Sequence, residues 1–444
     1  MSAKLWLALL PAVHFSRISQ LGFIVFARFL YSLVLVLLIP IAWVYLYCLR
    51  GRKNPGYRQH FGERFGYAQA TGDIILHCAS VGEVLASAPL IKALLGAKYR
   101  LVITCNTPTG REQITTLFAD AINKERLSCC YLPFDLPWCQ RRFIRRTQAK
   151  VLSIIETELW PNLLKQAKQA GLATVIINAR LSAKSANGYA KVAPLTRDIM
   201  RHIDVLACHH HDDAERFVKL GLAQHKVHVT GSIKFDITVS EKHQQQAQQL
   251  RHKFNKPFVW IAGSTHPCEP ELLLQAHQQL LKQQPSALLI IAPRHPEQFD
   301  NVATVLKQQN YDFCRRSHND YQGQSVMLAD TLGELTMLYG CADLAFIGGS
   351  LIARGGHNPL EACAHAIPVL TGPHTFNFAH VYPELINQGG AQQVQADNLA
   401  AQLIALSHDP HKRQQMGAIG LNVVKKNQGA IAKTLAIIEE YTDV

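Results

Sequence analysis

The sequence predicts an α/β protein of two doubly wound domains, each a parallel sheet covered by helices, preceded by an N-terminal membrane helix. From Asp73 onward, short apolar runs alternate with amphipathic stretches, which is typical of parallel sheets with helices on both faces. The alternation stops over a stretch rich in Gln, Lys and His at residues 241–256 and then starts again. With 444 residues, 48% hydrophobic and 17% charged, the chain is long enough for two globular domains.

We therefore expect an anchor at residues 1–50, a first domain at 51–240 and a second domain at 241–444, with a cleft between the domains. In such sheets ligands bind beyond the carboxyl ends of the strands. The residues that directly follow each predicted strand are accordingly the candidates for function.

The first element is Phe29–Leu49, a run without a formally charged residue. At about 1.5 Å per residue, a helix of this length spans roughly 30 Å, the thickness of a bilayer's hydrocarbon core. Pro40 is tolerable in such a helix, and no small-residue cleavage site follows it. We expect a single-pass anchor; a buried core helix and a monotopic hairpin are the alternatives.

The charges that flank this run weakly favour a cytoplasmic location for the globular part. Basic residues follow it at Arg50, Arg52, Lys53 and Arg58, and precede it at Lys4, Arg17 and Arg28.

Eleven strands are expected after the anchor. In the first domain they are Ile74–Cys78, Leu101–Thr104, Val151–Ile155, Thr174–Ile177, Val205–Cys208 and Val227–Thr230. In the second domain they are Phe258–Ala262, Ala287–Ala292, Val326–Leu328, Leu344–Ile347 and Pro368–Leu370.

The composition indicates an anionic partner, because the formal net charge is +13. Arg141, Arg142, Arg145 and Arg146 fall on one side of a predicted helix, which suits anionic headgroups or is a plain solvated face. Nucleic acid is disfavoured, since no aromatic platform or binding module accompanies the basic residues. The 11 cysteines are irregularly spaced and form no Cys-x-x-Cys pair, which favours a reducing compartment.

In the first domain, Glu83 opens a helix directly after a predicted strand. It is either a helix-start acid favoured by the macrodipole or a general base. The dipole alone would lower its pKa, so a base at this position needs apolar or carboxylate surroundings. Glu156 and Glu158 follow another strand and could serve acid–base chemistry or metal binding, and Lys234 at the domain junction could neutralise a leaving phosphate.

In the second domain, the Gly348-Gly349-Ser350 turn follows a strand and precedes a helix that begins near Pro359. Glycines let a backbone approach a ligand, so this turn is a candidate for the phosphate of a nucleotide, and Glu361 for its ribose hydroxyls. Arg294 ends another strand and could bind a phosphate or carboxylate bidentately.

Metal chemistry is not expected. The stretch Cys208-His209-His210-His211-Asp212-Asp213 has ligand-type side chains, but adjacent residues rarely converge on one ion. No Asp-x-Asp pair occurs in the chain, so the manganese–nucleotide clamp of many sugar transferases is missing.

Six motifs resemble those of a known family, the lipid A Kdo (3-deoxy-D-manno-octulosonic acid) transferases of the Gram-negative inner membrane. They are Ala79-Ser80-Val81-Gly82-Glu83, Glu156-Thr157-Glu158-Leu159-Trp160-Pro161-Asn162, Asn178-Ala179-Arg180, Gly231-Ser232-Ile233-Lys234-Phe235-Asp236, Ala292-Pro293-Arg294-His295 and Asn358-Pro359-Leu360-Glu361. The resemblance covers nearly the whole chain, and only the last motif is shared widely with other two-domain glycosyltransferases.

The resemblance implies a GT-B fold with a membrane-anchored acceptor domain and a C-terminal domain that binds CMP-Kdo. It implies inverting transfer of Kdo, without metal or cofactor, to the tetraacylated lipid A precursor on the cytoplasmic side of the inner membrane. Glu83 would then be the general base, and Glu156 and Lys234 would stabilise the transition state. The residues that would hold CMP are Pro293, Arg294, Gly333, Glu334, Leu335, Asn358, Pro359, Leu360 and Glu361.

Three rival functions are weighed against this one. A UDP-sugar-dependent transferase of envelope lipid synthesis, including a lipid A disaccharide synthase, would share the fold. A nucleotide-sugar epimerase would not need the membrane helix, and a non-catalytic scaffold would not need polar residues at so many strand ends. The number of Kdo units transferred stays open.

Overall fold

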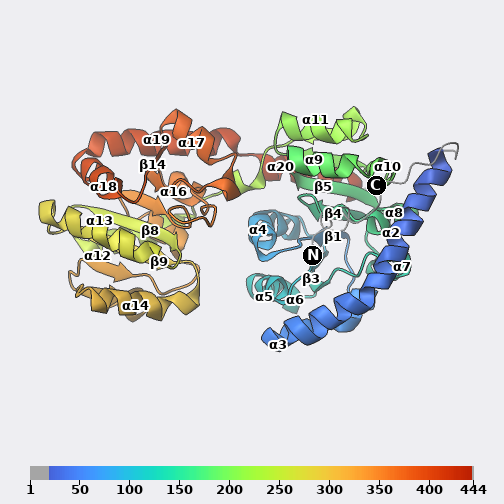
Figure 1. The fold of residues 1–444 in the computed structure, drawn as a ribbon, viewed down its shortest axis with the longest axis horizontal. Coiled ribbons are helices and arrows are strands. Elements are labelled where there is room, and N and C mark those ends of the chain that lie inside the picture. Colours follow the sequence, from blue (N-terminus) through green and yellow to red (C-terminus); the bar gives the residue numbers. More distant parts are fainter. Residues whose placement is uncertain (1–19, 443–444) are drawn as a thin grey trace. The chain divides into compact units, whose positions relative to one another are not determined.

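The computed structural model describes residues 20–442, which form two compact units. The first unit consists of the chain up to Asp236 and the C-terminal segment from Gly429; the second is Ile237–Gln428. Each unit contains one parallel sheet of seven strands, so the predicted pair of doubly wound domains is confirmed (Figure 1).

The first sheet has the order β3-β2-β1-β4-β5-β6-β7. Its strands are β1 Ile74–His77, β2 Leu101–Cys105, β3 Leu127–Tyr131, β4 Val151–Ile155, β5 Ala173–Ala179, β6 Val205–Cys208 and β7 Val227–Val229. Its helices are α4 Val81–Gly96, α5 Pro108–Leu117, α6 Ala119–Asn123, α7 Pro137–Thr147, α8 Pro161–Gln169, α9 Ala183–Ala190, α10 Ala193–Arg201, α11 His211–Lys219 and α20 Ala430–Thr442. Because β1 pairs with β2 on one side and β4 on the other, the order in which successive strands join the sheet reverses beside β1, and such switch points are where these sheets bind ligands.

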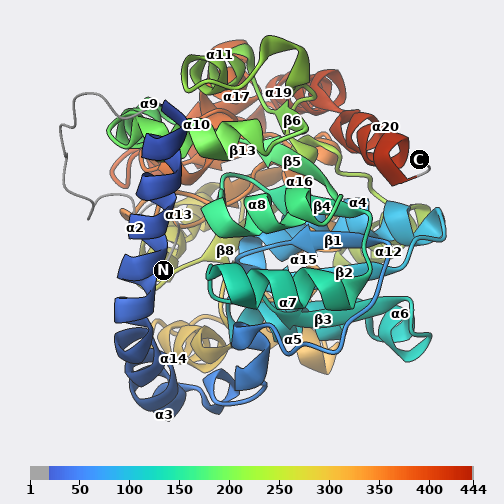
Figure 2. The same cartoon turned by 90° about the vertical axis from the view of Figure 1, so that its right-hand side faces the viewer.

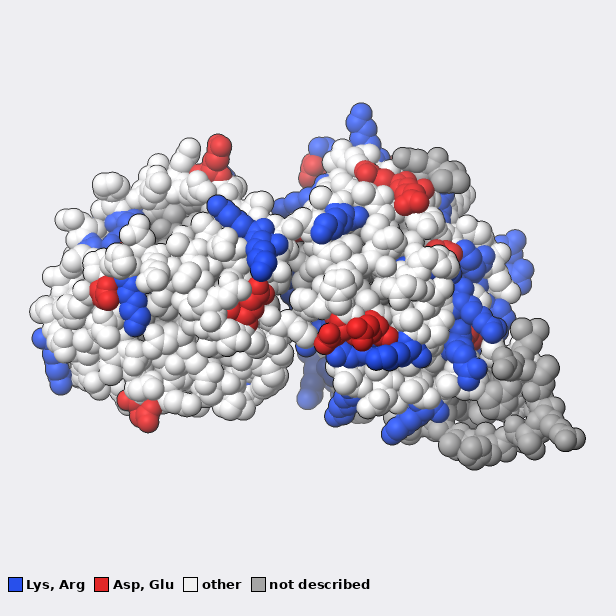
Figure 3. Space-filling view, turned by 90° about the horizontal axis from the view of Figure 1, so that it is seen from above, with Lys and Arg blue, Asp and Glu red and all other residues white. Residues whose placement is uncertain are grey.

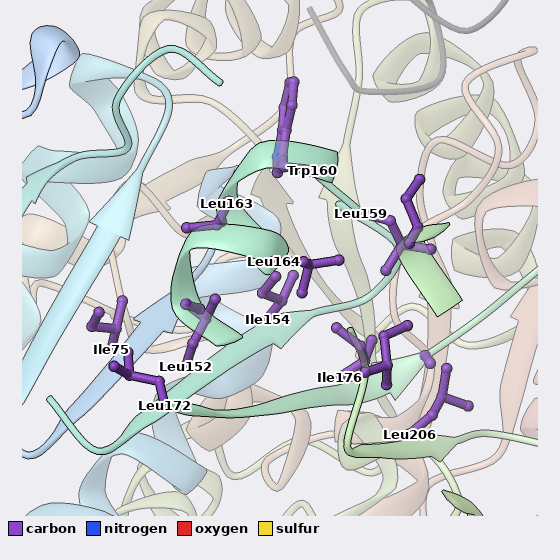
Figure 4. Packing of buried hydrophobic residues seen from close by; sticks show 14 of the residues in the cluster. Ile75, Leu152, Ile154, Leu159, Trp160, Leu163, Leu164, Leu172, Ile176 and Leu206 are labelled. Carbon is purple, nitrogen blue, oxygen red and sulfur yellow. The ribbon is translucent and has the colours of Figure 1, made fainter. Parts of the chain in front are cut away.

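Alternate residues of these strands fill two separate cores. Leu152 and Ile154 of β4 pack under α7, α8 and α10, and Figure 4 shows Leu163 and Leu164 of α8 over this face. Val151 and Ile155 point to the opposite face, which α4, α5 and α20 cover. Burial on both faces explains why these strands are continuous apolar runs.

The second sheet has the order β10-β11-β9-β8-β12-β13-β14. Its strands are β8 Val259–Thr265, β9 Leu288–Pro293, β10 Phe313–Arg315, β11 Val326–Leu328, β12 Leu344–Ile347, β13 Val369–Thr371 and β14 Ala391–Gln393. Its helices are α12 Glu241–Phe254, α13 Glu269–Gln283, α14 Phe299–Gln308, α15 Leu335–Tyr339, α16 Leu360–Ala364, α17 Tyr382–Gln388, α18 Leu399–His408 and α19 Pro410–Asn427. The switch point lies between β8 and β12.

The C-terminal segment differs from the expected boundary, which placed all residues after 240 in the second domain. Helix α20 packs on the first unit, where Ile438 is fully buried among core residues. The Asp236 carboxylate accepts hydrogen bonds from the amides of Gly429 and Ile431, and Lys150 Nζ donates to the carbonyl oxygen of Thr442 over 3.0 Å. These contacts hold α20 against the face of the first sheet that α4 and α5 also cover.

The predicted anchor is α2 (Gln20–Trp43), which continues as a π-helix over Val44–Arg50 and as the short α3 (Gly51–Lys53). Within it, Ile24–Lys53 is long and apolar enough to cross a membrane, with a mean hydropathy of 2.5. Pro40 lies inside α2 without ending it. Lys4 and Arg17, two of the basic residues that precede the apolar run, lie outside the described residues.

Polar contacts fasten the first part of α2 to the globular part of the first unit. Arg28 forms a buried ion pair with Asp198 at 2.8 Å. Tyr31 Oη donates to Asp135 Oδ2 over 3.0 Å, and Asn162 Nδ2 donates to Ser32 Oγ over 3.0 Å. Figure 2 shows α2 beside α10 and the rest of this unit. The opposite side of α2 is apolar and exposed, with Phe29 63% and Leu37 67% exposed.

Candidate functional site

Glu83 lies at the beginning of α4, directly after β1, where the predicted base was expected. Ser80 caps the helix, and its Oγ accepts from the Glu83 amide over 3.3 Å. The Glu83 carboxylate in turn accepts from the Ala79 amide over 2.7 Å and from Ser80 Oγ over 3.1 Å. This reciprocal capping holds the carboxylate over the first turn of the helix.

The environment of Glu83 makes its carboxyl group less acidic than usual. Burial, which is the largest cause, and the negative charges of Glu156 and Glu158 raise its pKa to about 7, against the hydrogen bonds from Ala79 and Ser80. A base at this position needs such surroundings to offset the helix dipole, and they are present around Glu83. The carboxyl is therefore partly ionised at neutral pH and can exchange a proton there.

Glu156 and Lys234 lie close together in the same unit. Glu156 follows β4 in a left-handed backbone conformation (φ 60°), and Lys234 Nζ is 3.7 Å from Glu156 Oε1. Because Glu156 also acts electrostatically on Glu83, the three predicted catalytic residues form one cluster of charges.

Asn178 positions the loop that carries Lys234. Its Oδ1 accepts from the amide of Ile233 over 3.2 Å and from Ser232 Oγ over 3.4 Å, and lies 2.6 Å from His209 Nε2. Asn178 is buried in the left-handed region (φ 54°), which Asn tolerates better than most residues. Asn178 thus holds the loop that carries Lys234, and His209, from the stretch Cys208–Asp213, contacts the Asn178 side chain.

The predicted CMP-binding residues all lie in the second unit, at strand ends or in the loops and short helices that follow the strands. Arg294 is exposed after β9, and Glu361 lies in the first turn of α16, where its carboxylate accepts from Thr336 Oγ1 over 2.5 Å. Burial raises the pKa of Glu361, while the Thr336 hydrogen bond and the charge of Arg294 lower it. Leu360 is fully buried and Asn358 Oδ1 accepts from the Leu360 amide over 3.1 Å, so these two residues shape the loop.

Of the remaining predicted residues, Gly333, Glu334 and Leu335 lie together at the beginning of α15. Gly333 has a positive φ of 81°, and a Cβ added there would meet open space. Glu334 pairs with Arg316 at 2.8 Å and accepts from Thr331 Oγ1. Leu335 begins α15, whereas Pro293 ends β9 and Pro359 caps α16.

The expected phosphate role of the Gly348-Gly349-Ser350 turn is wrong. The carboxylate of Glu269, at the beginning of α13 and fully buried, accepts from the amides of Gly349, Ser350 and Leu351 over 2.7, 3.1 and 3.2 Å. An internal carboxylate therefore occupies the donors that a phosphate would need. Glu269 was not predicted, since its only signal in the sequence is an acidic residue four positions after the end of β8 at Thr265.

No group of three or more His, Cys, Asp and Glu side chains that could hold a metal ion occurs within residues 20–442.

Comparison with known proteins assigns the family. A family model described as 3-deoxy-D-manno-octulosonic-acid transferase (kdotransferase) matches residues 59–237. A 3-deoxy-D-manno-octulosonic acid transferase of Haemophilus influenzae is 38% identical over 429 residues, which cover 94% of this chain and 99% of that protein. This chain belongs to the Kdo transferase family. A Kdo transferase of Bordetella pertussis is 32% identical and covers 93% of this chain and 99% of its own length.

Solved structures place this Kdo transferase among GT-B proteins. A UDP-GlcNAc 2-epimerase of Neisseria meningitidis, bound to UDP-GlcNAc, covers 83% of this chain and 99% of its own at a TM-score of 0.55. At 15% identity this likeness shows the fold alone. Membership of the Kdo transferase family makes the chain a glycosyltransferase, so the epimerase and scaffold alternatives are set aside.

Proposed function

We propose that this chain transfers Kdo from CMP-Kdo to the tetraacylated lipid A precursor in lipopolysaccharide synthesis, with inversion and without a metal ion. The observation that carries the proposal is the Glu83 carboxyl, whose pKa is raised to about 7 at a strand end of a Kdo transferase. Such a pKa suits a group that must accept a proton near neutral pH.

In the proposed reaction, Glu83 accepts the proton of the acceptor hydroxyl as the hydroxyl oxygen bonds to the anomeric carbon of Kdo. The bond from that carbon to the phosphate oxygen breaks, and CMP leaves with the electron pair. Attack opposite to the leaving group inverts the configuration. We assign Lys234 and Glu156 to the stabilisation of the charges that develop, because their paired side chains place opposite charges beside Glu83.

We assign CMP binding to the second unit through the nine residues named above. The guanidinium of Arg294 is exposed and suited to the phosphate, and the carboxylate of Glu361 to ribose hydroxyls. A UDP-sugar donor is the alternative. Thermal unfolding distinguishes the two: CMP should raise Tm more than UDP at equal concentration, and the reverse order would favour the alternative.

We assign the acceptor to the first unit and membrane attachment to α2. The face of the molecule in Figure 3 shows Lys and Arg side chains on both units, and on the first unit they are interspersed with Asp and Glu. On α7, Arg141, Arg145 and Arg146 are exposed, and the Arg142 guanidinium lies 4.0 Å from the ring centroid of Tyr67. Basic and aromatic groups of this kind suit an anionic lipid surface and a phosphorylated lipid.

The membrane placement extends this proposal: a single-pass anchor in the inner membrane with both units in the cytoplasm. A full span would require the contacts of Arg28, Tyr31 and Ser32 with the first unit to open, because these residues lie in the N-terminal part of α2. Attachment along the cytoplasmic surface would keep them. If α2 spans the membrane, a cysteine placed at the N-terminus of the protein should react, in intact cells, with a thiol reagent that cannot cross the inner membrane. Protection of that thiol would mean that α2 lies along the cytoplasmic surface.

The deciding experiment is transfer from CMP-Kdo to the lipid A precursor in detergent with EDTA, followed by mass spectrometry of the lipid. We expect a product heavier by one or more Kdo units, and the mass counts the additions. Product from a UDP-sugar alone, or a reaction that EDTA abolishes, would contradict the proposal.

A further inference from the structure

Three histidines gather in the second unit, each from a different loop at the end of a strand. His266 follows β8, His295 follows β9 and His357 lies in the loop after β12. His266 Nε2 and His357 Nε2 are 2.8 Å apart, and their rings are nearly parallel, with an angle of 6°. The His295 ring meets His266 edge-on, with the centroids 5.6 Å apart.

The loop before His357 is folded so that the two rings meet. The amides of Gly356 and His357 donate back to the carbonyl oxygens of Gly349 and Gly348 over 2.8 and 3.2 Å. A Cβ on Gly349 would lie 3.0 Å from the His357 ring and 3.3 Å from that of His266. The backbone at Gly349 thus lies directly against both histidine rings, and a larger residue at this position would displace them.

Two arginines add positive charge to the pair. The charges of Arg354 and Arg294 both lower the pKa of His266, for which burial is the largest cause. Neither guanidinium makes a hydrogen bond or an ion pair within the described residues 20–442. The Arg354 backbone is nevertheless held, since its carbonyl oxygen accepts from Asn377 Nδ2 over 2.8 Å.

The nearby carboxylates are already engaged. Glu269 accepts four amide hydrogen bonds, including one from His266 over 2.9 Å, and Glu361 accepts from Thr336. In the shared Nε2 hydrogen bond one ring donates and the other accepts, so the accepting ring carries its proton on Nδ1 when neutral. The cluster therefore offers an N–H donor and two guanidinium groups to an anion from outside the chain.

We propose that His266 and His357, together with Arg354, bind the carboxylate of the donor sugar, while Arg294 binds the adjacent phosphate. This inference rests on the proposed function. Kdo is a 2-ulosonic acid, so the anomeric carbon that carries the phosphate also carries the carboxylate. The donor thus presents two anions on neighbouring atoms, and nucleotide-activated aldoses present only the phosphate there. A pair of histidines beside two arginines gives each anion its own donors.

The test compares two ligands, CMP and CMP-Kdo, because only the second has the carboxylate. We expect Arg354→Ala and His357→Gln in the full-length protein to weaken CMP-Kdo binding by about tenfold to a hundredfold, with CMP binding changed less than about twofold. Lys307→Ala, which removes an exposed charge from α14, is the matched control and should change neither. Arg354 is exposed, so its replacement does not depend on refolding a core.

Two results would overturn the inference. Equal weakening of CMP and CMP-Kdo would mean that the cluster binds the phosphate, and no weakening of either would mean that it binds no part of the donor. Failure of the proposed function is a separate result: wild-type protein would then neither transfer Kdo nor bind CMP-Kdo.

Discussion

At the end of β1, one carboxylate is subject to two opposing influences. The amide of Ala79 and the hydroxyl of Ser80 stabilise ionised Glu83, whereas burial and the charges of Glu156 and Glu158 stabilise its protonated form. The second influence is larger, and the pKa rises to about 7. A group with this pKa is a base at cellular pH and a source of electrostatic cost in the folded protein.

Replacement of Glu83 by glutamine should remove the base and keep the cap, because the amide oxygen can still accept from Ala79. We expect kcat to fall about 10²- to 10⁴-fold while the Kd of CMP stays unchanged. Steady-state transfer and calorimetry with CMP measure the two quantities. Near-wild-type turnover would exclude Glu83 as the base.

The same variant should change how stability depends on pH. The folded pKa of Glu83 is about 7 and its ordinary value is 4.5, so between these pH values the folded state keeps a proton that the unfolded state has lost. The free energy of unfolding of the wild type therefore falls as pH rises through this window. Glu83→Gln lacks this loss and should have a higher Tm than wild type at pH 8, with little difference at pH 4.5. A constant difference at both pH values would argue against the raised pKa.

Site residues that directly follow a strand could be predicted from the sequence. Residues whose side chains accept hydrogen bonds from buried backbone amides elsewhere in the chain could not. Glu83, Glu156 and Lys234 each stand in a motif at a strand end, and the structure brings them together. Glu269 binds three amides of a turn some 80 positions away in the sequence. Such a long-range partner leaves no local pattern.

Among the elements, all the central strands could be predicted, whereas three of the four edge strands could not. The eleven expected strands are present, and burial on both faces makes the central ones continuous apolar runs; the edge strand β7 is the exception, since its three residues are partly or fully exposed. The three missed strands have weak signals: β3 reads Leu-Ser-Cys-Cys-Tyr, and β10 and β14 contain only three residues each. The stretch at residues 241–256, which carried no strand signal, is helix α12.

Helix α2 leads to a prediction at this scale. Leu37 is 67% exposed on the side of α2 away from the unit, so Leu37→Asp should leave folding intact and weaken attachment to anionic vesicles. Co-sedimentation with phosphatidylglycerol vesicles measures the attachment. Leu117→Asp, at a 38% exposed position of α5, is the control and should bind like wild type. Equal binding by both variants would contradict the role of α2.

For the whole molecule, the chain leaves the first unit after Asp236 and returns to it at Gly429. No local pattern predicts this return, because α20 is an ordinary amphipathic helix whose partner is decided by packing. The first unit is consequently complete only after the whole second unit has been synthesised.

Removal of buried volume at the end of the chain should therefore destabilise the first unit. Ile438 is fully buried, so we expect Ile438→Ala to lower the free energy of unfolding of that unit by about 2–5 kcal/mol. Glu440→Ala, exposed on the same helix, is the control. Denaturant unfolding followed with and without CMP separates the units, since CMP should protect the second unit equally in both variants. Loss of CMP protection in Ile438→Ala would show that the second unit depends on α20.

The chain passes between the units twice, after Asp236 and before Gly429. The Asp236 carboxylate links these two crossings, because it accepts hydrogen bonds from the amides of Gly429 and Ile431. The two ends of Ile237–Gln428 therefore leave the first unit from neighbouring points, as the ends of an inserted cassette do. Recombination could exchange such a cassette at a single locus without lengthening either junction. With donor and acceptor binding divided between the two units as proposed above, a lineage could in this way acquire a new activated sugar and keep its acceptor.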